Sequence, residues 1–516
     1  MAIKYEGSFL SEADTLEISV LCLMPEPGIK PRAIVQLVHG MSEHKERYIP
    51  FMEYLTDKGY ITVIHDHRGH GKSVSDKKDL GYMYGGGADA MLKDVLTVNE
   101  EIRRHFPELP LILFGHSMGS LAVRAFAAKH DDCMNMLIVC GSPSENKARP
   151  LGKAIAKVQG KLLGSHHKSK ILETMSFGTY ALKFKDEKNK NAWICSDPAV
   201  YEAYTKSDLC GFTFTDDAYI ALFDLMKKAY DVLVIGPVSL DHNIDYQGNE
   251  RKEVGGAVVA SGFAAAKSGN RTAVFTKLNP ADADVEERFA GSGADVYWKP
   301  SQATCSIRNQ YFTADKEKRA CTSMGVCDPF RFDELPDIET KIYHFAGLVY
   351  GDFDGALFAE AARHGKVAVD VQCLLRHVEA DRTMAFHDWA EKKQYLPVID
   401  YLKTDAAEAE ILTGLTDRAE AAKLLHSWGA KEVLITHNTE VLAYDGVTTY
   451  TCPIKARNLS GRTGRGDTTF AGYISERQRA GVEEALRYCT ALVSLKMETP
   501  GPFQGTRQDV LDYIRE

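Results

Sequence analysis

The sequence of 516 residues lacks the features of an exported or membrane protein. No stretch is long and apolar enough to span a bilayer, and the start Met1–Glu6 lacks the apolar core and cleavage site of a secretory signal. The eleven cysteines include no Cys-x-x-Cys pair, which favours reduced thiols over a disulfide framework or a zinc site. We therefore expect a soluble, cytoplasmic protein without a membrane span.

Basic runs are also absent, and the formal net charge is -9. A nucleic-acid partner is therefore not expected, because phosphate binding needs a basic surface. The content of 44% hydrophobic and 26% charged residues is typical of globular proteins. Since a single core stops growing at roughly 250 to 300 residues, the length predicts two domains. No Gly/Ser-rich or Pro-rich linker, repeat or low-complexity tract separates them.

Short apolar runs alternate with helical patterns in both halves, which indicates parallel sheets covered by helices. The strands expected in the first half are Ala33–Val38, Tyr60–Ile64, Leu111–Phe114 and Met136–Cys140. Lys-rich, helix-like sequence follows from about Ser144 to Tyr230 and suggests a cap. The strands expected in the second half are Asp231–Ile235, Thr272–Phe275, Ile342–Phe345, Val367–Asp370, Leu396–Ile399 and Val433–Thr436. The predicted domains are residues 1–230 and 231–516.

A glycine-rich turn before a helical pattern is the most informative segment of the second half. Gly464-Arg465-Gly466-Asp467 can direct successive backbone N–H groups at an anion, and a helix starting there adds its positive dipole end. Asp467, at the mouth of such an anion hole, can accept the proton of an attacking hydroxyl during phosphoryl transfer. The alternative is structural, because an Asp in a first helical turn is often only a cap.

The second half resembles the PfkB or ribokinase-like carbohydrate kinases from Asp231 to the C-terminus. Gly464–Asp467 matches the C-terminal Gly-Ala-Gly-Asp signature, and Gly255–Gly269 resembles the N-terminal Gly-Gly signature. Asp241 matches the aspartate that binds substrate in that family. Tyr401–Gly414 resembles the Asn-x-x-Glu segment, whose glutamate would be Glu408.

The resemblance implies a doubly wound α/β fold with a small lid, and ATP with Mg²⁺ as cofactors. Asp241, Gly255 and Gly256 would hold the substrate, and Asp467 would be the catalytic base. The backbone of Gly464, Arg465 and Gly466 would form the anion hole. Glu408 would help to organise Mg²⁺ through an indirect contact, and Thr436 is a weaker candidate for the nucleotide site.

Four departures from the family pattern narrow the prediction of substrate, and one of them is Gly461-Arg462 in place of the common Asp-Thr before the anion hole. Ala260 replaces the usual asparagine after the glycine pair, so one hydrogen bond to a sugar hydroxyl is lost. Asp405 replaces the asparagine before Glu408. Arg465 replaces a small residue of the anion hole, where it either stabilises phosphate charge or points to solvent. Phosphoryl transfer remains the expected chemistry, but ribose and fructose are not specifically indicated.

In the first half, Leu111–Gly119 reads as a strand, a Gly-x-Ser-x-Gly turn and the start of a helix. This order predicts a nucleophile elbow with Ser117 as its serine. The turn after an earlier strand, His39–His44, could offer the N–H of Met41 as a second oxyanion donor beside that of Met118.

These motifs resemble the monoacylglycerol lipase and serine aminopeptidase branch of the α/β-hydrolases, in which His39, His65 and His70 mostly support turns. The later strands that would carry the triad acid and histidine do not appear. The hydrolase fold is therefore expected to be truncated at its C-terminus, with an exposed sheet edge and doubtful activity. His166 or His167 is a poor candidate for a substitute base.

Together the patterns predict two three-layer αβα domains, an incomplete α/β-hydrolase fold followed by a ribokinase-like fold with a lid. The predicted function is ATP-dependent phosphorylation of a hydroxyl on a sugar, polyol or nucleoside. The alternatives are a serine hydrolase that acts on an acyl ester through Ser117, a ligand-binding protein built of two degenerate enzymes, and an artificial join of two reading frames. The resemblance also allows a homodimer, because lids of this family often pair.

Overall fold

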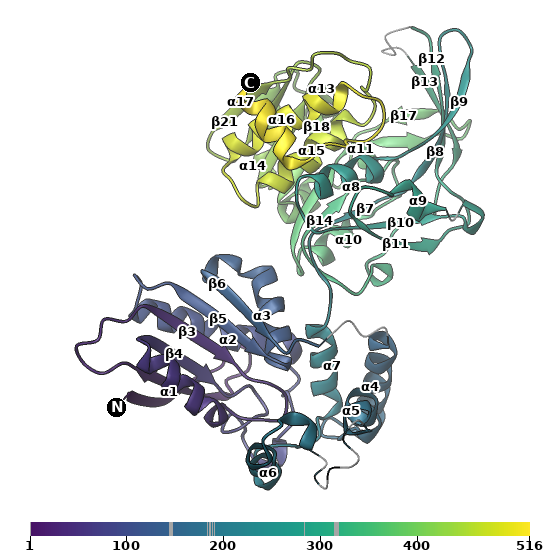
Figure 1. The fold of residues 1–516 in the computed structure, drawn as a ribbon. Coiled ribbons are helices and arrows are strands. Elements are labelled where there is room, and N and C mark those ends of the chain that lie inside the picture. Colours follow the sequence, from purple (N-terminus) through teal and green to yellow (C-terminus); the bar gives the residue numbers. More distant parts are fainter. Residues whose placement is uncertain are drawn as a thin grey trace. The chain divides into compact units, whose positions relative to one another are not determined.

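The computed structural model describes residues 2–143, 148–182, 184, 187, 189, 191–282, 284–313 and 319–516. The chain forms two compact units, Met1–Lys228 and Ala229–Glu516. Each unit is an α/β domain with its own sheet (Figure 1). The division falls two residues before the one expected from the sequence.

The first unit is built on a six-stranded sheet with the order β1-β2-β4-β3-β5-β6. Strands β4, β3, β5 and β6 are parallel, and the β1-β2 hairpin adds antiparallel strands at one edge. Their bounds are β1 Ile3–Leu10, β2 Glu17–Met24, β3 Ala33–Val38, β4 Tyr60–His65, β5 Leu111–His116 and β6 Met136–Cys140. The four strands expected from the sequence are confirmed.

Alternating side chains of the central strands pack on opposite faces of this sheet. On one face Ile34 joins a core cluster with α2 and α3, and on the other Val35 packs with Met52 of α1. Such alternation is the period of a strand covered on both sides. The helices are α1 Ile49–Asp57, α2 Gly87–His105 and α3 Met118–Lys129. The unit therefore has the expected three layers.

The cap region is helical, as the sequence predicts, although its expected start, Ser144, lies outside the described residues. Its helices are α4 Arg149–Leu163, α5 Lys170–Leu182, α6 Pro198–Lys206 and α7 Asp216–Leu225. The apolar helix α7 packs against α2, α3 and α4 and completes the core of the unit.

Strand β6 is the last strand of the first sheet and is largely exposed. Its residues Met136, Ile138 and Val139 have exposed fractions of 54%, 39% and 39%, whereas every residue of β3 is buried. The strand after the cap, β7 Ala229–Ile235, pairs with β10 and β14 of the second unit. Within the described residues the first sheet thus ends at β6, as expected for a truncated hydrolase fold.

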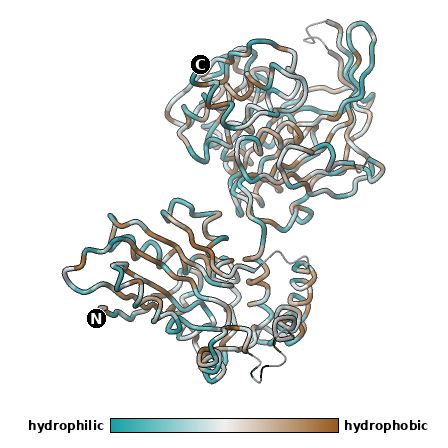
Figure 2. Tube along the Cα trace, in the orientation of Figure 1, coloured by the Kyte–Doolittle hydropathy of each residue, from teal (hydrophilic) through white to brown (hydrophobic). Residues whose placement is uncertain are grey.

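The second unit contains a nine-stranded sheet with the order β11-β10-β7-β14-β15-β18-β19-β20-β21. Strands β11 to β19 in this order are parallel, and β20 and β21 are antiparallel. The bounds are β10 Thr272–Leu278, β11 Asp295–Pro300, β14 Glu339–Phe345, β15 Lys366–Asp370, β18 Tyr401–Asp405, β19 Glu432–Thr436, β20 Glu440–Tyr444 and β21 Thr449–Pro453. In the first unit, the backbone segments of the six-stranded sheet carry mostly hydrophobic residues (Figure 2).

One expected strand of the second unit is wrong. Residues Leu396–Val398 form a short 3₁₀ helix, and the strand of this region is β18, which begins at Tyr401. Pro397 explains the difference, because proline has no N–H for the ladder and its φ suits the first turn of a helix.

Helices α8, α15, α16 and α17 pack against one another beside the sheet. Their bounds are Ala257–Lys267, Arg465–Glu476, Val482–Met497 and Arg507–Arg515. Helices α10 Gly355–Ala361, α13 Ala406–Thr413 and α14 Arg418–Ser427 contact strands β15, β18 and β19. The remaining helices are short: α9 Val285–Arg288, α11 Gln372–Leu375 and α12 Lys392–Tyr395.

A separate four-stranded sheet, ordered β13-β12-β8-β9, forms the lid (Figure 1). Its strands are β8 Ser239–Ile244, β9 Glu250–Gly255, β12 Ser306–Tyr311 and β13 Arg319–Gly325. Arg376–Val378 and Met384–Phe386 form the small hairpin β16-β17. Among the described residues, no helix combines the length and apolar character needed to cross a membrane.

Candidate active sites

The two glycine signatures of the second unit, more than 200 residues apart in sequence, lie side by side. Helix α8 packs against α15, and a Cβ on Gly464 would stand 3.1 Å from Cβ of Ala260. The Ser261 hydroxyl also donates to the Asp467 carbonyl oxygen at 3.5 Å. The substituted position Ala260 thus borders the expected anion hole.

The turn before α15 has the geometry of an anion hole. Gly464 is the N-cap of this helix and has a φ of +75°, a conformation that costs little only for glycine. The following backbone N–H groups belong to a first helical turn, where four amides have no partner in the helix. The dipole of a 12-residue helix adds positive potential there.

Asp467 lies in this first turn, in a half-buried and highly charged environment. Burial is the main cause that raises the pKa of its carboxyl group to about 6, and the negative charge of Asp370 adds to the effect. The positive charges of Lys403 and Arg376 oppose it. A carboxylate with a pKa near neutrality is well matched to accept a proton from an alcohol as its bond to phosphorus forms.

A buried lysine under the glycine turn is a feature that sequence analysis missed. Lys403 of β18 pairs with Asp370 of β15, with its Nζ 2.9 Å from Oδ2 and 3.1 Å from Oδ1. A Cβ on Gly466 would lie 3.3 Å from this Nζ. Burial disfavours the ammonium, but Asp370 and Glu408 outweigh it and raise the pKa of Lys403. The glycine turn therefore has a charged lysine beneath it.

A second lysine anchors the loop that leads into the turn. Lys496 of α16 donates hydrogen bonds through its Nζ to the carbonyl oxygens of Gly461, at 2.5 Å, and Thr463. Burial lowers the pKa of Lys496 to about 8, although the charge of Asp467 partly counteracts it. The side chain is almost inaccessible, which fits a positioning role.

Glu408 forms a capping box with Asp405 at the start of α13. The Asp405 N–H donates to Glu408 Oε2, and the Glu408 N–H donates to Asp405 Oδ1, both at 2.8 Å. Burial raises the pKa of Glu408 to about 7, and its Oε2 lies 3.8 Å from Lys403 Nζ. The aspartate that replaces the family's asparagine is thus a good N-cap. The Thr436 hydroxyl of the neighbouring strand donates to the Thr404 carbonyl oxygen at 3.5 Å.

The expected substrate residues lie together where β8 and β9 of the lid meet α8. Gly255 pairs with Ser239, and a Cβ on Gly255 would approach Asp241 Oδ2 to 3.0 Å. The Ser239 hydroxyl donates to Asp241 Oδ1. Gly256 has a φ of +104°, and a side chain there would meet the Pro237 carbonyl oxygen at 2.6 Å. The glycine pair allows this close approach.

Arg465, the other departure in the signature, extends to the β19-β20 turn. Its guanidinium donates to Asn438 Oδ1. This hydrogen bond gives the Arg465 side chain a defined position. The effect of Arg465 on a bound phosphate stays a prediction.

The nucleophile elbow of the first unit is fully formed in its backbone. Ser117 has a φ of +51°, which is strained for a residue with a side chain. A Cβ on Gly119 would lie 2.0 Å from the Val38 carbonyl oxygen, so the elbow needs glycine where the helix crosses β3. The loop before Met41 is close, since a Cβ on Gly40 would stand 3.3 Å from Ser117 Cβ. Met118 is the first residue of α3.

No side chain of the described residues hydrogen-bonds to the Ser117 hydroxyl. His166 and His167 instead pair with Asp79, at 3.3 Å, and with Asp216, at 2.7 Å. His39 and His70 are buried and bonded to the backbone of the neighbouring turns. His65 is also buried, but neither of its ring nitrogens has a partner among the described residues. The elbow thus has its turn without a hydrogen-bonded base.

Comparison with known proteins separates the same two regions. The model of the serine aminopeptidase S33 family matches residues 29–233, and that of the pfkB family of carbohydrate kinases matches residues 224–507. A monoacylglycerol lipase of Mycolicibacterium smegmatis is 33% identical over 146 residues, which are 26% of this chain and 48% of the lipase. The chain spans 31% to 50% of the length of five such lipases.

Similarity to the kinases covers nearly the whole length of the relatives. A cytidine kinase of Thermococcus kodakarensis is 26% identical over 274 residues, which are 50% of this chain and 92% of the kinase. A solved structure described as a pyrophosphate-dependent kinase in the ribokinase family, complexed with a pyrophosphate analog and myo-inositol, is 32% identical. It covers 55% of this chain and 99% of its own, with a TM-score of 0.50. Through its second unit, the chain belongs to the pfkB family of carbohydrate kinases.

Proposed function

We propose that the second unit transfers a phosphoryl group from ATP to a hydroxyl of a sugar, polyol or nucleoside, with Asp467 as the general base. The observation that carries this proposal is the position of Asp467 in the first turn of α15, beside the Gly464 turn and above the buried Lys403. Base, anion hole and fixed cation are the parts that phosphoryl transfer requires.

In this mechanism Asp241 and the Gly255-Gly256 backbone orient the acceptor hydroxyl towards Asp467. Asp467 accepts the hydroxyl proton as the oxygen attacks phosphorus, and the donor leaves with the electrons of the broken P–O bond. The N–H groups of Gly464 to Gly466 stabilise the developing charge, together with Lys403 beneath them. Lys496 holds the loop in place through Gly461 and Thr463.

The residues near the turn fit a polyphosphate with Mg²⁺. Bound Mg²⁺ would neutralise donor phosphates during transfer. Glu408 is buried and already accepts the Asp405 N–H, so an indirect role through water suits it better than direct ligation. Thr436 remains the weaker candidate for contact with the nucleotide.

A second donor, inorganic pyrophosphate, is favoured by one specific finding. The 32% identical structure is described as pyrophosphate-dependent and was solved with a pyrophosphate analog. A donor made only of phosphate needs N–H groups and cations but no pocket for a nucleoside. Gly464 to Gly466 supply the N–H groups, and Lys403 and Arg465 supply the cations. Pyrophosphate is therefore the alternative to ATP.

The acceptor candidates can be ranked by the same reasoning. One similar protein is described as complexed with myo-inositol, which is a cyclic polyol. Another is described as a cytidine kinase, and cytidine is a nucleoside. Ala260 offers no side-chain hydrogen bond, which weakens the case for ribose, and the protein described with myo-inositol is the more similar of the two, at 32% against 26% identity. We place a cyclic polyol first and a nucleoside second.

A matrix of two donors and three acceptors tests the proposal. Wild type and Asp467→Asn are incubated with ATP or pyrophosphate and with myo-inositol, cytidine or ribose, and phosphorus NMR identifies the new phosphoester. We expect one donor to give acceptor-dependent product with wild type only. Equal product from Asp467→Asn would refute the role of Asp467, and absence of product from every pair would refute the acceptor class.

A serine hydrolase acting on an acyl ester is the second candidate function, favoured by the strained elbow at Ser117. In it Ser117 would be the nucleophile, with the N–H groups of Met41 and Met118 as oxyanion donors. Covalent labelling by a fluorophosphonate, with Ser117→Ala as control, tests this function. Labelling equal to that of the control would exclude it.

The homodimer expected from the family would use the lid. Strand β9 ends the lid sheet, and five of its six residues are exposed. Strand edges of this kind pair readily with another copy. Sedimentation velocity of wild type against Lys252→Pro would test the contact, since proline there removes an N–H that points away from β8, and an unchanged sedimentation coefficient would contradict it.

We also retain a cytoplasmic location as part of the proposal. All eleven cysteines are free, which suits a reducing compartment. Fractionation of cells expressing the full chain would test it.

A further inference from the structure

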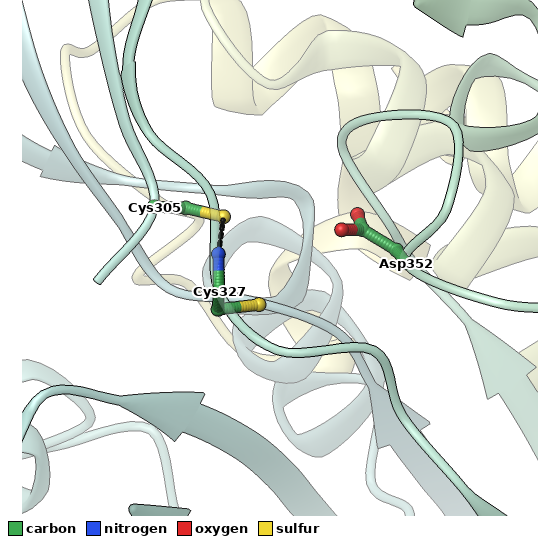
Figure 3. A group of neighbouring side chains, drawn as sticks. All are labelled: Cys305, Cys327 and Asp352. Atoms are coloured by element: carbon green, nitrogen blue, oxygen red, sulfur yellow. Dashed lines mark hydrogen bonds between the residues drawn. The ribbon is translucent and has the colours of Figure 1, made fainter. Parts of the chain in front are cut away.

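A cluster of three buried side chains in the second unit takes no part in the proposed phosphoryl transfer. It consists of Cys305, Cys327 and Asp352, whose exposed fractions are 2%, 5% and 1%. Two Sγ atoms and one carboxylate oxygen lie within 4.8 Å of one another. Figure 3 shows the three side chains turned towards a common centre from three different segments.

The cluster lies where the lid joins the core sheet. Cys305 immediately precedes β12, Cys327 follows β13, and Asp352 belongs to the loop between β14 and α10. The Cys327 N–H donates to Cys305 Sγ at 3.3 Å, shown as the dashed line in Figure 3. The Cys305 carbonyl oxygen accepts the Leu240 N–H at 2.8 Å, which connects the cluster to β8.

Asp352 has one oxygen engaged and one without a partner. Its Oδ2 accepts the N–H groups of Leu348, at 2.6 Å, and Val349, at 3.0 Å. Its Oδ1 is buried and has no hydrogen-bond partner among the described residues. A buried carboxylate oxygen without a partner is unfavourable, so each such atom calls for a ligand or a structural reason. Here the carboxylate faces the two cysteines (Figure 3).

The donor set selects one class of ion. Thiolate sulfur prefers Zn²⁺ to the hard cations Mg²⁺ and Ca²⁺, and a carboxylate oxygen is also an accepted zinc ligand. Zinc binds sulfur at about 2.3 Å and oxygen at about 2.0 to 2.2 Å, so ligand atoms in a tetrahedron lie roughly 3.5 to 3.8 Å apart. The cluster needs only a small contraction to reach this geometry.

We propose that Cys305, Cys327 and Asp352 bind one zinc ion, with water as the fourth ligand. Two Zn–S bonds replace the two S–H bonds, whose protons pass to solvent, and Asp352 Oδ1 gains the partner that it lacks. The ion joins both ends of the β12-β13 hairpin to the loop after β14. It thereby fixes the base of the lid, whose strand β8 carries Asp241.

Metal content of the full chain tests the site. The protein is stripped with a chelator under reducing conditions, dialysed against zinc and measured by elemental mass spectrometry. We expect one zinc per chain in wild type and loss of that stoichiometric zinc in Cys327→Ser and in Asp352→Asn. Asn at position 352 keeps an acceptor for the amides of Leu348 and Val349, so this variant preserves the loop. Cys489→Ser, a buried cysteine of α16, is the matched control and should retain the zinc.

Cobalt provides a second readout that does not depend on activity. Co²⁺ in place of zinc should give intense thiolate-to-metal absorption in wild type and in Cys489→Ser, and weaker absorption in Cys327→Ser. Protection of the lid is then followed by limited proteolysis, which zinc should slow in wild type and in Cys489→Ser but not in Cys327→Ser.

Two results would overturn the proposal. One is equal zinc content in wild type and in the double variant Cys305→Ser/Cys327→Ser. The other is a mass for the reduced-and-reoxidised wild type that lacks two hydrogens at these cysteines, with no zinc bound, which would identify a disulfide pair instead. Neither result depends on kinase activity, so failure of the zinc site is distinguishable from failure of the proposed function.

Discussion

The elbow at Ser117 and the turn at Gly464 both begin a helix with a residue of positive φ, but their surroundings differ. Each places a residue of positive φ directly before a 12-residue helix, at +51° and +75°. Around Asp467 four distant segments contribute Asp370, Arg376, Lys403 and Lys496. Around the Ser117 hydroxyl, in the part of the chain that the structure describes, no side chain provides a hydrogen-bonded base. A local motif therefore specifies a turn, and the distant side chains determine whether that turn can catalyse.

The largest expected effect comes from removing the buried cation of the kinase site. Lys403→Met leaves Asp370 buried without its partner, and breaking such a pair typically costs about 3–5 kcal/mol. We expect the free energy of unfolding of the second unit to fall by that amount, so that it unfolds at a lower denaturant concentration. Phosphoryl transfer should also be lost. Urea unfolding followed by fluorescence measures it. A matched variant, Lys423→Met on the exposed face of α14, should change stability little, and equal effects would contradict the account.

A smaller effect is expected from the glycine that starts α15. Gly464→Ala places a side chain at a φ of +75° and 3.1 Å from Ala260 Cβ. Strain of this kind costs about 1–3 kcal/mol, so we expect turnover to fall by about 10- to 100-fold as the turn shifts. Steady-state kinetics measures the loss. Gly414→Ala, at a helix end with open space around it, is the control for positive φ alone, and an equal loss of turnover there would show that the anion hole is not special.

The pH dependence of turnover sharpens the role of Asp467. The carboxyl with a pKa raised to about 6 must be deprotonated to act as base, so kcat/KM should rise as pH increases through about 6. Lys496, with a pKa lowered to about 8, should lose its charge above that pH, and activity should then decline. Lys496→Arg should remove the alkaline decline, since arginine stays protonated. A profile flat between pH 5 and 9, a range set roughly around these values, would contradict both roles.

The smallest expected effect concerns the elbow. Ser117→Ala should leave phosphoryl transfer unchanged, since Ser117 belongs to the first unit and has no role in the proposed chemistry. It should also remove any fluorophosphonate labelling. Kinase assays and labelling on the same preparations compare the two sites directly, and a fall in kinase turnover in Ser117→Ala would break the separation between them.

Much of the fold was predictable from local patterns. Nine of the ten expected strands are present, and the tenth failed at Pro397, where the apolar run forms a 3₁₀ turn before β18. The truncation of the hydrolase fold was also predictable, because β7 continues into Asp241 and the glycine pair of the kinase. The exposed apolar residues of β6 are its structural consequence.

The charged partners of the kinase site were not predictable from local patterns. Asp370 is the last residue of the apolar strand β15, and Lys403 is the middle residue of the apolar strand β18. Their pairing depends on these two strands being neighbours. Lys496 lies in an amphipathic helix more than 30 residues beyond the carbonyls it binds. The cluster of Cys305, Cys327 and Asp352 was not predicted for the same reason. A hairpin separates Cys305 from Cys327, whereas familiar zinc motifs place their cysteines a few residues apart.

The most direct test of the central claim is acceptor-dependent phosphoryl transfer by Asp467→Asn. Asparagine preserves the size of the side chain but cannot accept the proton, so we predict a fall in kcat of about 10²- to 10⁴-fold with little change in the melting temperature. Wild type and Ser117→Ala, assayed with the same donor and polyol, should be equal to each other. A turnover of Asp467→Asn equal to that of wild type would contradict the claim that this aspartate is the base of the kinase site.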